Sequence, residues 1–251
     1  MTMSNYNPFS LENKAVLVTG ASSGIGERTA IECSKMGANT IITARNSERL
    51  QNTFNQLESH PANGQIIADL TKVEDIDRMV MELPPLDGLV LNAGVLKTMP
   101  VKNINEESMM NVFETNILSS IRFIQRLLKA KKINANASIV FISSISTFQV
   151  KKGNSLYSAT KGAINSFAKV LAVEVAARGI RVNCIQPGFI RTHVLDAGAV
   201  TEEQLQEHFK KYPLGIGSPE DIAFPAIYLL SDAAKWVTGG VFTIDGGGTL
   251  Q

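Results

Sequence analysis

Short apolar runs alternate along the chain with longer segments in which apolar residues recur at helical spacing. The short runs cover residues 15–18, 40–42, 65–67, 88–91, 138–142, 181–185 and 241–244. Strands that are apolar on both faces are typical of a parallel sheet covered by helices on both sides. The pattern predicts an α/β protein with a single-domain Rossmann fold, in which a seven-stranded parallel sheet carries helices on both faces.

The length of the chain is compatible with one large domain. Its 251 residues contain no internal repeat and no low-complexity linker that would divide them. Residues 1–13 precede the first predicted strand and are expected to form an N-terminal arm. Residues 14–251 are expected to form the Rossmann-type domain.

Two long segments, 106–131 and 155–178, have a helical period, and the second ends before Gly179, a typical C-terminal cap. In the first, the repeating apolar residues are Phe113, Ile117, Ile121, Ile124 and Leu128. Both segments are more apolar than a surface helix requires. Core packing and a subunit interface explain this equally well.

Composition and charge exclude several classes of protein. The net charge is +1 and no Lys/Arg block with interleaved aromatic residues occurs, so nucleic acid is not an expected partner. We find no secretory signal and no long apolar span, which predicts a cytoplasmic protein without a membrane partner. Cys33 and Cys184 lie far apart in apolar contexts and are expected to be buried reduced thiols. No metal site is predicted, because the three histidines, His60, His193 and His208, occur in no ligand pattern.

A glycine-rich turn follows the first predicted strand and opens a helix. Residues 20–26 read Gly-Ala-Ser-Ser-Gly-Ile-Gly. Glycines at such a turn let the backbone approach a pyrophosphate, whose charge is stabilised by the helix N-terminus. Tight turns also use glycine for conformational reasons alone, so the order of strand, turn and helix carries the prediction of a nucleotide site.

The spacing of these glycines, G-x-x-x-G-x-G after Thr19, resembles that of the short-chain dehydrogenase/reductase family. Further motifs follow in the family's order: Asp69, Asn92-Ala93-Gly94, Ser144, Tyr157 with Lys161, and Pro187-Gly188. The resemblance covers roughly residues 14–248, and the family pattern has asparagine where Leu91 stands here.

This resemblance implies a nicotinamide dinucleotide site. Its cofactor-binding residues would be Gly20, Ser22, Ser23, Gly24, Ile25, Gly26, Arg45, Asp69, Leu70, Asn92, Ala93, Gly94, Tyr157, Lys161, Pro187, Gly188, Ile190 and Thr192. In the family's arrangement Asp69 and Leu70 contact the adenine, and the residues from Pro187 onward lie by the nicotinamide.

The charge at the end of the second predicted strand favours NADP(H) over NAD(H). NAD-selective sites place an acidic residue there, about 20 residues beyond the glycines, to bind the ribose hydroxyls. Here Ala44 is followed by Arg45, whose guanidinium suits a 2′-phosphate. The alternative is that Arg45 is a solvated surface residue.

Four residues match the family's catalytic positions: Asn116, Ser144, Tyr157 and Lys161. The resemblance implies that Tyr157 transfers the proton and that Ser144 orients the substrate oxygen. Lys161, whose positive charge would lower the pKa of Tyr157, would also bind the nicotinamide ribose. Asn116 would hold a water linking Lys161 to solvent. Each residue alone could be structural, and their joint spacing carries the prediction.

The predicted activity is NADP(H)-dependent hydride transfer between nicotinamide and a carbonyl or secondary alcohol. Residues 176–183 and 238–247 most resemble 3-oxoacyl-acyl-carrier-protein reductases, which makes an acyl-carrier protein a candidate partner. Arg178 matches a carrier-docking position of that group, and Lys129, Lys131 and Lys132 are either part of such a patch or ordinary charges at helix ends. Alternative substrates are a steroid, sugar, polyol or small ketone.

The alternative from another class is a non-catalytic NADP(H)-binding redox sensor or scaffold. Residues 190–212 are expected to form a substrate lid. Candidates for the substrate wall are Val95, Leu96, Met99, Phe148, Gln149 and Val150. The two apolar helices and a family-like C-terminal strand predict a homo-oligomer, specifically a tetramer.

Overall fold

A computed structural model of the chain describes residues 6–192, 203 and 210–250. Seven strands form one parallel sheet in the order β3-β2-β1-β4-β5-β6-β7. The strands are β1 (Ala15–Thr19), β2 (Asn39–Ala44), β3 (Gly64–Ile67), β4 (Leu86–Leu91), β5 (Ile133–Ile142), β6 (Arg181–Pro187) and β7 (Val241–Ile244). All seven predicted strands are therefore present, and the predicted Rossmann fold is confirmed.

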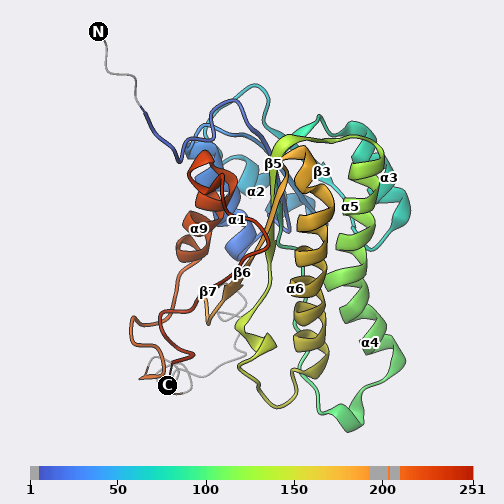
Figure 1. The fold of residues 1–251 in the computed structure, drawn as a ribbon. Helices are drawn as coiled ribbons and strands as arrows, with labels where there is room; N and C mark the ends of the chain where they lie inside the picture. Colours follow the sequence, from blue (N-terminus) through green and yellow to red (C-terminus); the bar gives the residue numbers. More distant parts are fainter. Residues whose placement is uncertain (1–5, 193–202, 204–209, 251) are drawn as a thin grey trace.

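Helices cover both faces of the sheet (Figure 1). They are α1 (Gly24–Lys35), α2 (Ser47–Phe54), α3 (Val73–Glu82), α4 (Glu106–Phe113), α5 (Ser119–Lys129), α6 (Ser155–Val175) and α9 (Glu220–Leu230). A π-helical segment, η2 (Glu114–Leu118), joins α4 to α5. The short 3₁₀ segments are η1 (Val101–Asn103), η3 (Ile145–Thr147), η4 (Ala176–Arg178) and η5 (Asp232–Ala234).

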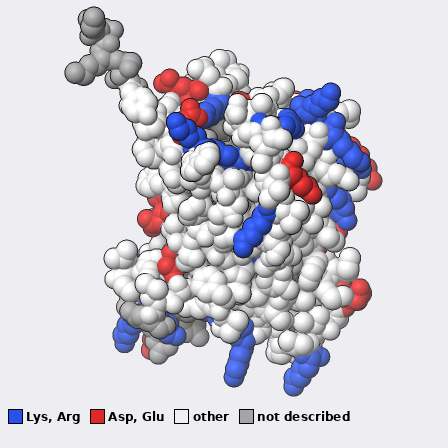
Figure 2. Space-filling view, in the orientation of Figure 1, with Lys and Arg blue, Asp and Glu red and all other residues white. Residues whose placement is uncertain are grey.

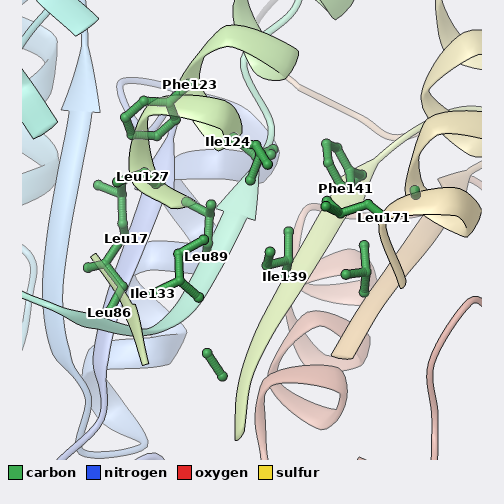
Figure 3. Close-up of a cluster of buried hydrophobic side chains, with 14 of the residues drawn as sticks. Leu17, Leu86, Leu89, Phe123, Ile124, Leu127, Ile133, Ile139, Phe141 and Leu171 are labelled. Atoms are coloured by element: carbon green, nitrogen blue, oxygen red, sulfur yellow. The ribbon is translucent and has the colours of Figure 1, made fainter. Parts of the chain in front are cut away.

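One apolar core lies between the sheet and helices α3, α5 and α6. Figure 3 shows Phe123, Ile124 and Leu127 of α5 next to Leu17 of β1 and Leu89 of β4, all of them buried. These residues leave water together, and each fully buried large apolar side chain stabilises the fold by about 1.5–3 kcal/mol.

A second core lies on the opposite face, under α1, α2 and α9. Strand residues alternate between the two cores, so that Val16 and Val18 enter this core while Leu17 enters the other. Leu11 of the N-terminal arm is fully buried here, and its backbone N–H donates to the carbonyl of Met36. Part of the segment predicted as an arm is thus packed on the domain.

The strand order reverses direction at β1, which has β2 on one side and β4 on the other. Ligands of open α/β sheets bind at such a switch point, beyond the carboxyl ends of the strands. The Thr19 hydroxyl joins the two strand ends, because its Oγ1 accepts hydrogen bonds from the backbone N–H of Asn92 (3.1 Å) and Ala93 (3.3 Å).

The two long helices are less regular than predicted. The segment predicted as one helix over 106–131 is divided by the π turn at 114–118 and ends at Lys129. The helix predicted over 155–178 is α6 followed by the 3₁₀ turn η4. Gly179 follows with a φ of 70°, a left-handed conformation that favours glycine at a helix end.

Most of the predicted substrate lid, residues 193–202 and 204–209, lies outside the described residues. Within the described part of the chain, no helix is both long enough and apolar enough to cross a membrane.

Candidate active site

A cavity of about 340 Å³ lies at the carboxyl ends of β1, β2 and β4. Its walls include nine of the residues predicted to bind the cofactor: Gly20, Ser22, Ser23, Arg45, Asp69, Leu70, Asn92, Ala93 and Gly94. The strand ends bring these residues together although they are distant in the sequence. The remaining predicted residues lie outside this cavity.

The glycine turn leaves no room for larger side chains. A Cβ on Gly20, whose φ is +63°, would lie 2.9 Å from the Cα of Ala93. A Cβ on Gly26 would lie 2.3 Å from the carbonyl oxygen of Gly20, which accepts a 3.2 Å hydrogen bond from Nδ2 of Asn92. Glycine is therefore required here for close approach of backbone to backbone.

The N-terminus of α1 faces this cavity with its N-cap unfilled by a side chain. Ser23 has the extended conformation of an N-cap, but its hydroxyl makes no capping hydrogen bond. The free N–H groups of a first helical turn favour an anion, and Ser22 and Ser23 at the cavity wall add hydroxyl donors. A dinucleotide pyrophosphate fits this arrangement.

The adenosine end of the cavity contains two arginines, Arg45 and Arg49. Neither forms an ion pair with a carboxylate of the described residues. Arg49 was missed by the sequence analysis. Asn46 caps α2 by accepting a hydrogen bond from the Arg49 N–H (2.8 Å). Arg49 therefore lies on the first turn of this helix, where it lines the cavity. The helix-capping residue Asn46, three positions earlier, is the feature of the sequence that could have identified Arg49.

Asp69 also lines the cavity, but its carboxylate is partly engaged. Oδ1 accepts hydrogen bonds from the backbone N–H (3.0 Å) and the hydroxyl (2.8 Å) of Thr71. The Asp69 N–H in turn donates to Asp75 (2.8 Å). These contacts fix the loop after β3 against the adenine end of the cavity.

The predicted residues near the nicotinamide half follow β6. The Gly188 N–H donates to the carbonyl of Ile244 (2.9 Å), and Ile190 forms a bridge with Gly217. Thr192 lies against Gly24, and both line a second cavity of about 330 Å³. Ile25 packs beside the α1/α9 core, and Pro187 ends β6.

Ser144 and Tyr157 lie close together at the carboxyl edge of the sheet. Ser144 follows β5 and caps η3, its Oγ accepting from the N–H of Ser146 (3.1 Å). Tyr157 lies in the first turn of α6. Burial raises the pKa of Tyr157, and a hydrogen bond with the Ser144 side chain lowers it in part.

Lys161 is buried one helical turn after Tyr157. Its Nζ donates a 2.8 Å hydrogen bond to the carbonyl of Ile142 and lies 5.6 Å from the centroid of the Tyr157 ring. Burial lowers the pKa of Lys161 to about 8, and Cys184 nearby opposes that shift. One N–H of the ammonium is used by Ile142, which leaves two for a ligand.

The pKa of Tyr157 departs from the sequence-based expectation. We expected the Lys161 ammonium to lower it, whereas in this structure burial dominates and raises it. The ammonium is directed to the Ile142 carbonyl instead. Tyr157 therefore keeps its proton at neutral pH.

Asn116 is fully buried in the π turn and is bonded on both sides of its amide. Oδ1 accepts from the Val95 N–H (2.7 Å), and Nδ2 donates to the Val95 carbonyl (3.0 Å) and to the Thr160 hydroxyl (3.1 Å). The expected water-holding role is thus not visible in its side chain, because both amide hydrogens have protein partners. Thr160 was missed as the residue joining Asn116 to α6.

Gly94 connects the cavity to this cluster. It lines the cavity wall, and a Cβ placed on it would lie 3.3 Å from Oδ1 of Asn116 and 3.5 Å from Nζ of Lys161. The nucleotide cavity and the polar cluster are therefore neighbours at one edge of the sheet.

The basic residues considered for carrier docking lie at the other edge. Arg178 donates to the carbonyl of Ile133, the first residue of β5. Lys132 donates to the carbonyls of Met81 (3.3 Å) and Leu83. Both side chains support backbone at the amino ends of the strands. Among the described residues, no group of three or more metal-ligating side chains could hold a metal ion.

Known proteins resemble this chain over nearly its whole length. A family model described as enoyl-(acyl carrier protein) reductase matches residues 20–249. A 3-oxoacyl-[acyl-carrier-protein] reductase of Rickettsia felis is 33% identical over 238 residues, covering 94% of this chain and 97% of that protein. A tropinone reductase homolog of Arabidopsis thaliana is 31% identical, covering 97% of this chain and 95% of that protein.

Solved structures agree with this. A short-chain type dehydrogenase/reductase from Mycobacterium marinum has a TM-score of 0.87 and 30% identity, covering 97% of this chain and 98% of that one. One from Mycobacterium ulcerans has a TM-score of 0.87 and 29% identity, covering 96% and 92%. Fold, glycine turn and polar cluster agree with these comparisons: the chain belongs to the short-chain dehydrogenase/reductase family.

Proposed function

We propose that this protein is an NADPH-dependent carbonyl reductase. The observation that carries the proposal is the placement of Ser144, Tyr157 and the buried Lys161 together at the carboxyl edge of the sheet, next to a cavity lined by the glycine turn. A bound nicotinamide cofactor supplies the hydride that the carbonyl carbon accepts.

The side chains of the cluster handle the charge that then develops on the substrate oxygen. Ser144 donates a hydrogen bond to that oxygen and orients it. Tyr157, protonated at neutral pH because burial raises its pKa, donates the proton that completes the alcohol. Lys161 would hold the nicotinamide ribose with its two remaining N–H groups. Asn116 positions the 95–100 loop and α6 on either side of the reacting centre.

Arg45 and Arg49 support a preference for NADPH. Two guanidinium groups at the adenosine end attract a 2′-phosphate, and no acidic residue stands at the end of β2 to bind the free hydroxyls of NADH. The uncapped N-terminus of α1 would hold the pyrophosphate.

The names of similar proteins indicate which substrates should be tested first. Those named 3-oxoacyl-[acyl-carrier-protein] reductases include proteins of Rickettsia felis and Chlamydia trachomatis, the latter 34% identical over 245 residues. Thioesters of 3-oxo acids are therefore the leading candidates, with an acyl-carrier protein as the natural carrier. The similarity to a tropinone reductase homolog supports cyclic ketones as alternative substrates.

The test is NADPH oxidation, followed by absorbance, with a panel of carbonyl compounds that includes an acetoacetyl thioester, cyclic ketones and sugars. We expect turnover with at least one compound and none in Tyr157→Phe. NADPH binding without turnover of any compound would overturn the reductase proposal and favour a cofactor-binding sensor. Equal or better kcat/KM with NADH would overturn the NADPH preference alone.

A further inference from the structure

Lys151 lies in the loop that joins the two halves of the catalytic cluster. It is seven residues after Ser144 and six before Tyr157. Its Nζ lies 5.9 Å from the centroid of the Phe189 ring, which belongs to the segment after β6. The ammonium group is therefore held at the carboxyl edge, between the ends of two neighbouring strands, β5 and β6.

This loop is tied to two other segments of the same edge. Nε2 of Gln149 donates to the carbonyl of Gly248 (3.0 Å) in the C-terminal segment. The carbonyl of Gly153 accepts from the N–H of Met99 (2.9 Å), on the segment that follows β4. These hydrogen bonds, at Gln149 and Gly153 on either side of Lys151, fix the position of the loop.

The charge of Lys151 has no acidic partner. No carboxylate of the described residues forms an ion pair with Lys151 or Lys211. Partial burial and the positive charge of Lys211 both lower the pKa of Lys151. Asp245, at the same edge, accepts from the N–H groups of Gly247 and Thr249 instead. An anion beside Lys151 would stabilise its charged form.

Exposed apolar side chains lie on the Lys151 loop and on the segment that follows β4. Leu96, Phe148 and Val150 have exposed fractions of 61%, 52% and 81%. Figure 2 shows Lys and Arg side chains projecting from the lower side of the molecule, where β6 ends in Figure 1. The mouth of the site thus combines apolar surface with the positive charge of Lys151.

We infer that the substrate is a carbonyl compound with an anionic group, a carboxylate or a phosphate, which Lys151 binds. The apolar residues of the two loops would contact the chain between that group and the carbonyl. This inference rests on the proposed reductase function and names the class of its substrate.

Two pairs of probes distinguish the sources of the anion. The first pair is 5-oxohexanoate and its methyl ester, which differ by one carboxylate. The second is acetoacetyl phosphopantetheine and acetoacetyl pantetheine, which differ by one phosphate. We expect at least one anionic member to have a higher kcat/KM than its neutral partner. This preference should weaken as ionic strength rises, because Lys151 remains exposed to solvent in spite of its partial burial.

Variants of Lys151 test whether this residue causes the preference for the anionic compound. Lys151→Gln should lower kcat/KM for the anionic compound by about tenfold and change that of the neutral partner less than twofold. Lys151→Arg should retain most of the preference. Lys235→Gln is the matched control, since it removes the same charge from an exposed position between η5 and the start of β7. It should change neither member of a pair.

Each outcome decides the inference. A preference in the first pair identifies a carboxylate, and one confined to the second identifies a phosphate. Equal rates within both pairs, a neutral compound as the best substrate of the wider panel, or an unchanged preference in Lys151→Gln would overturn the inference and leave the reductase function intact. Absence of turnover with every carbonyl compound would refute the reductase function itself.

Discussion

The side-chain amide of Asn116 binds both polar groups of the Val95 backbone, with Oδ1–N and Nδ2–O distances of 2.7 and 3.0 Å. This pairing, which resembles one rung between two strands, attaches the loop after β4 to the π turn. Asn116→Ala would leave the Val95 groups and the Thr160 hydroxyl without these partners.

We expect Asn116→Ala to lower the free energy of unfolding by roughly 2–4 kcal/mol, since each of three buried hydrogen bonds contributes about 0.5–1.5 kcal/mol. Its kcat should also fall, because the loop and α6 lose their common anchor. Urea unfolding and steady-state kinetics measure both. Thr160→Val, which removes a single partner, is the control and should be less damaging; equal effects of the two variants would contradict the role of the Val95 contacts.

Tyr157→Phe should reduce kcat by at least about a hundredfold, because the proton donor is lost while the ring remains. Cofactor affinity, measured by NADPH fluorescence titration, should stay within about twofold. Activity within tenfold of the wild type would remove Tyr157 from the mechanism.

Arg45→Ala and Arg49→Ala should each weaken NADPH binding by about tenfold to a hundredfold, as expected for the loss of a charged hydrogen bond of about 1.5–3 kcal/mol. NADH binding should scarcely change, and it serves as the internal control. If Arg49→Ala has no effect on NADPH while Arg45→Ala does, the phosphate is held by Arg45 alone.

The buried ammonium of Lys161 predicts a specific pH dependence of stability. Its pKa is about 8 in the folded protein and 10.5 ordinarily, so between these values the unfolded chain binds more protons than the folded one. Stability contributed by this group must then rise with pH from about 8 to 10.5. The difference in unfolding free energy between wild type and Lys161→Met reports this contribution together with the coupling of Lys161 to Cys184. A difference that does not change between pH 7.5 and 9.5 would show that Lys161 is not desolvated to this extent.

Much of this architecture is predictable because it follows from local rules. Strands buried on both faces are recognisable as apolar runs, and the glycine turn is fixed by backbone contact. The apolar residues read at helical spacing over 106–131 were only partly correct. Ile117 and Ile124 are buried as predicted, but Phe113 is only partly buried and Phe123 is fully buried. The prediction assumed an uninterrupted α-helical period, and the π turn has a different one.

Features that depend on tertiary contacts were not predictable. The hydrogen bond from Lys161 to Ile142 joins α6 to β5 and reflects the packing of a helix on a strand end. Burial of Tyr157, which decides the direction of its pKa shift, likewise needs the assembled site.

The apolar surface of α6 predicts association. Val170 and Val173 have exposed fractions of 59% and 79%, and we propose that this face lies in a homo-oligomer, a tetramer. Light scattering at micromolar concentration should give a multiple of the 27.2 kDa chain. Val173→Lys should lower that mass, whereas Met81→Lys, on the exposed side of α3, should not. A monomeric wild type would refute this.

The π turn at 114–118 also limits which changes in chain length this protein can accept. A π turn contains one residue more than an α turn, so deleting one residue there would leave a regular α-helix with α5 still in phase with α4. Phe123 and Leu127 would keep facing the sheet, but Asn116 would lose the wide turn that places its amide against Val95. Surface loops tolerate insertions and deletions, but here the extra residue lies between the core and the reacting centre. Homologous chains that keep this site must therefore keep the same number of residues between α4 and α5.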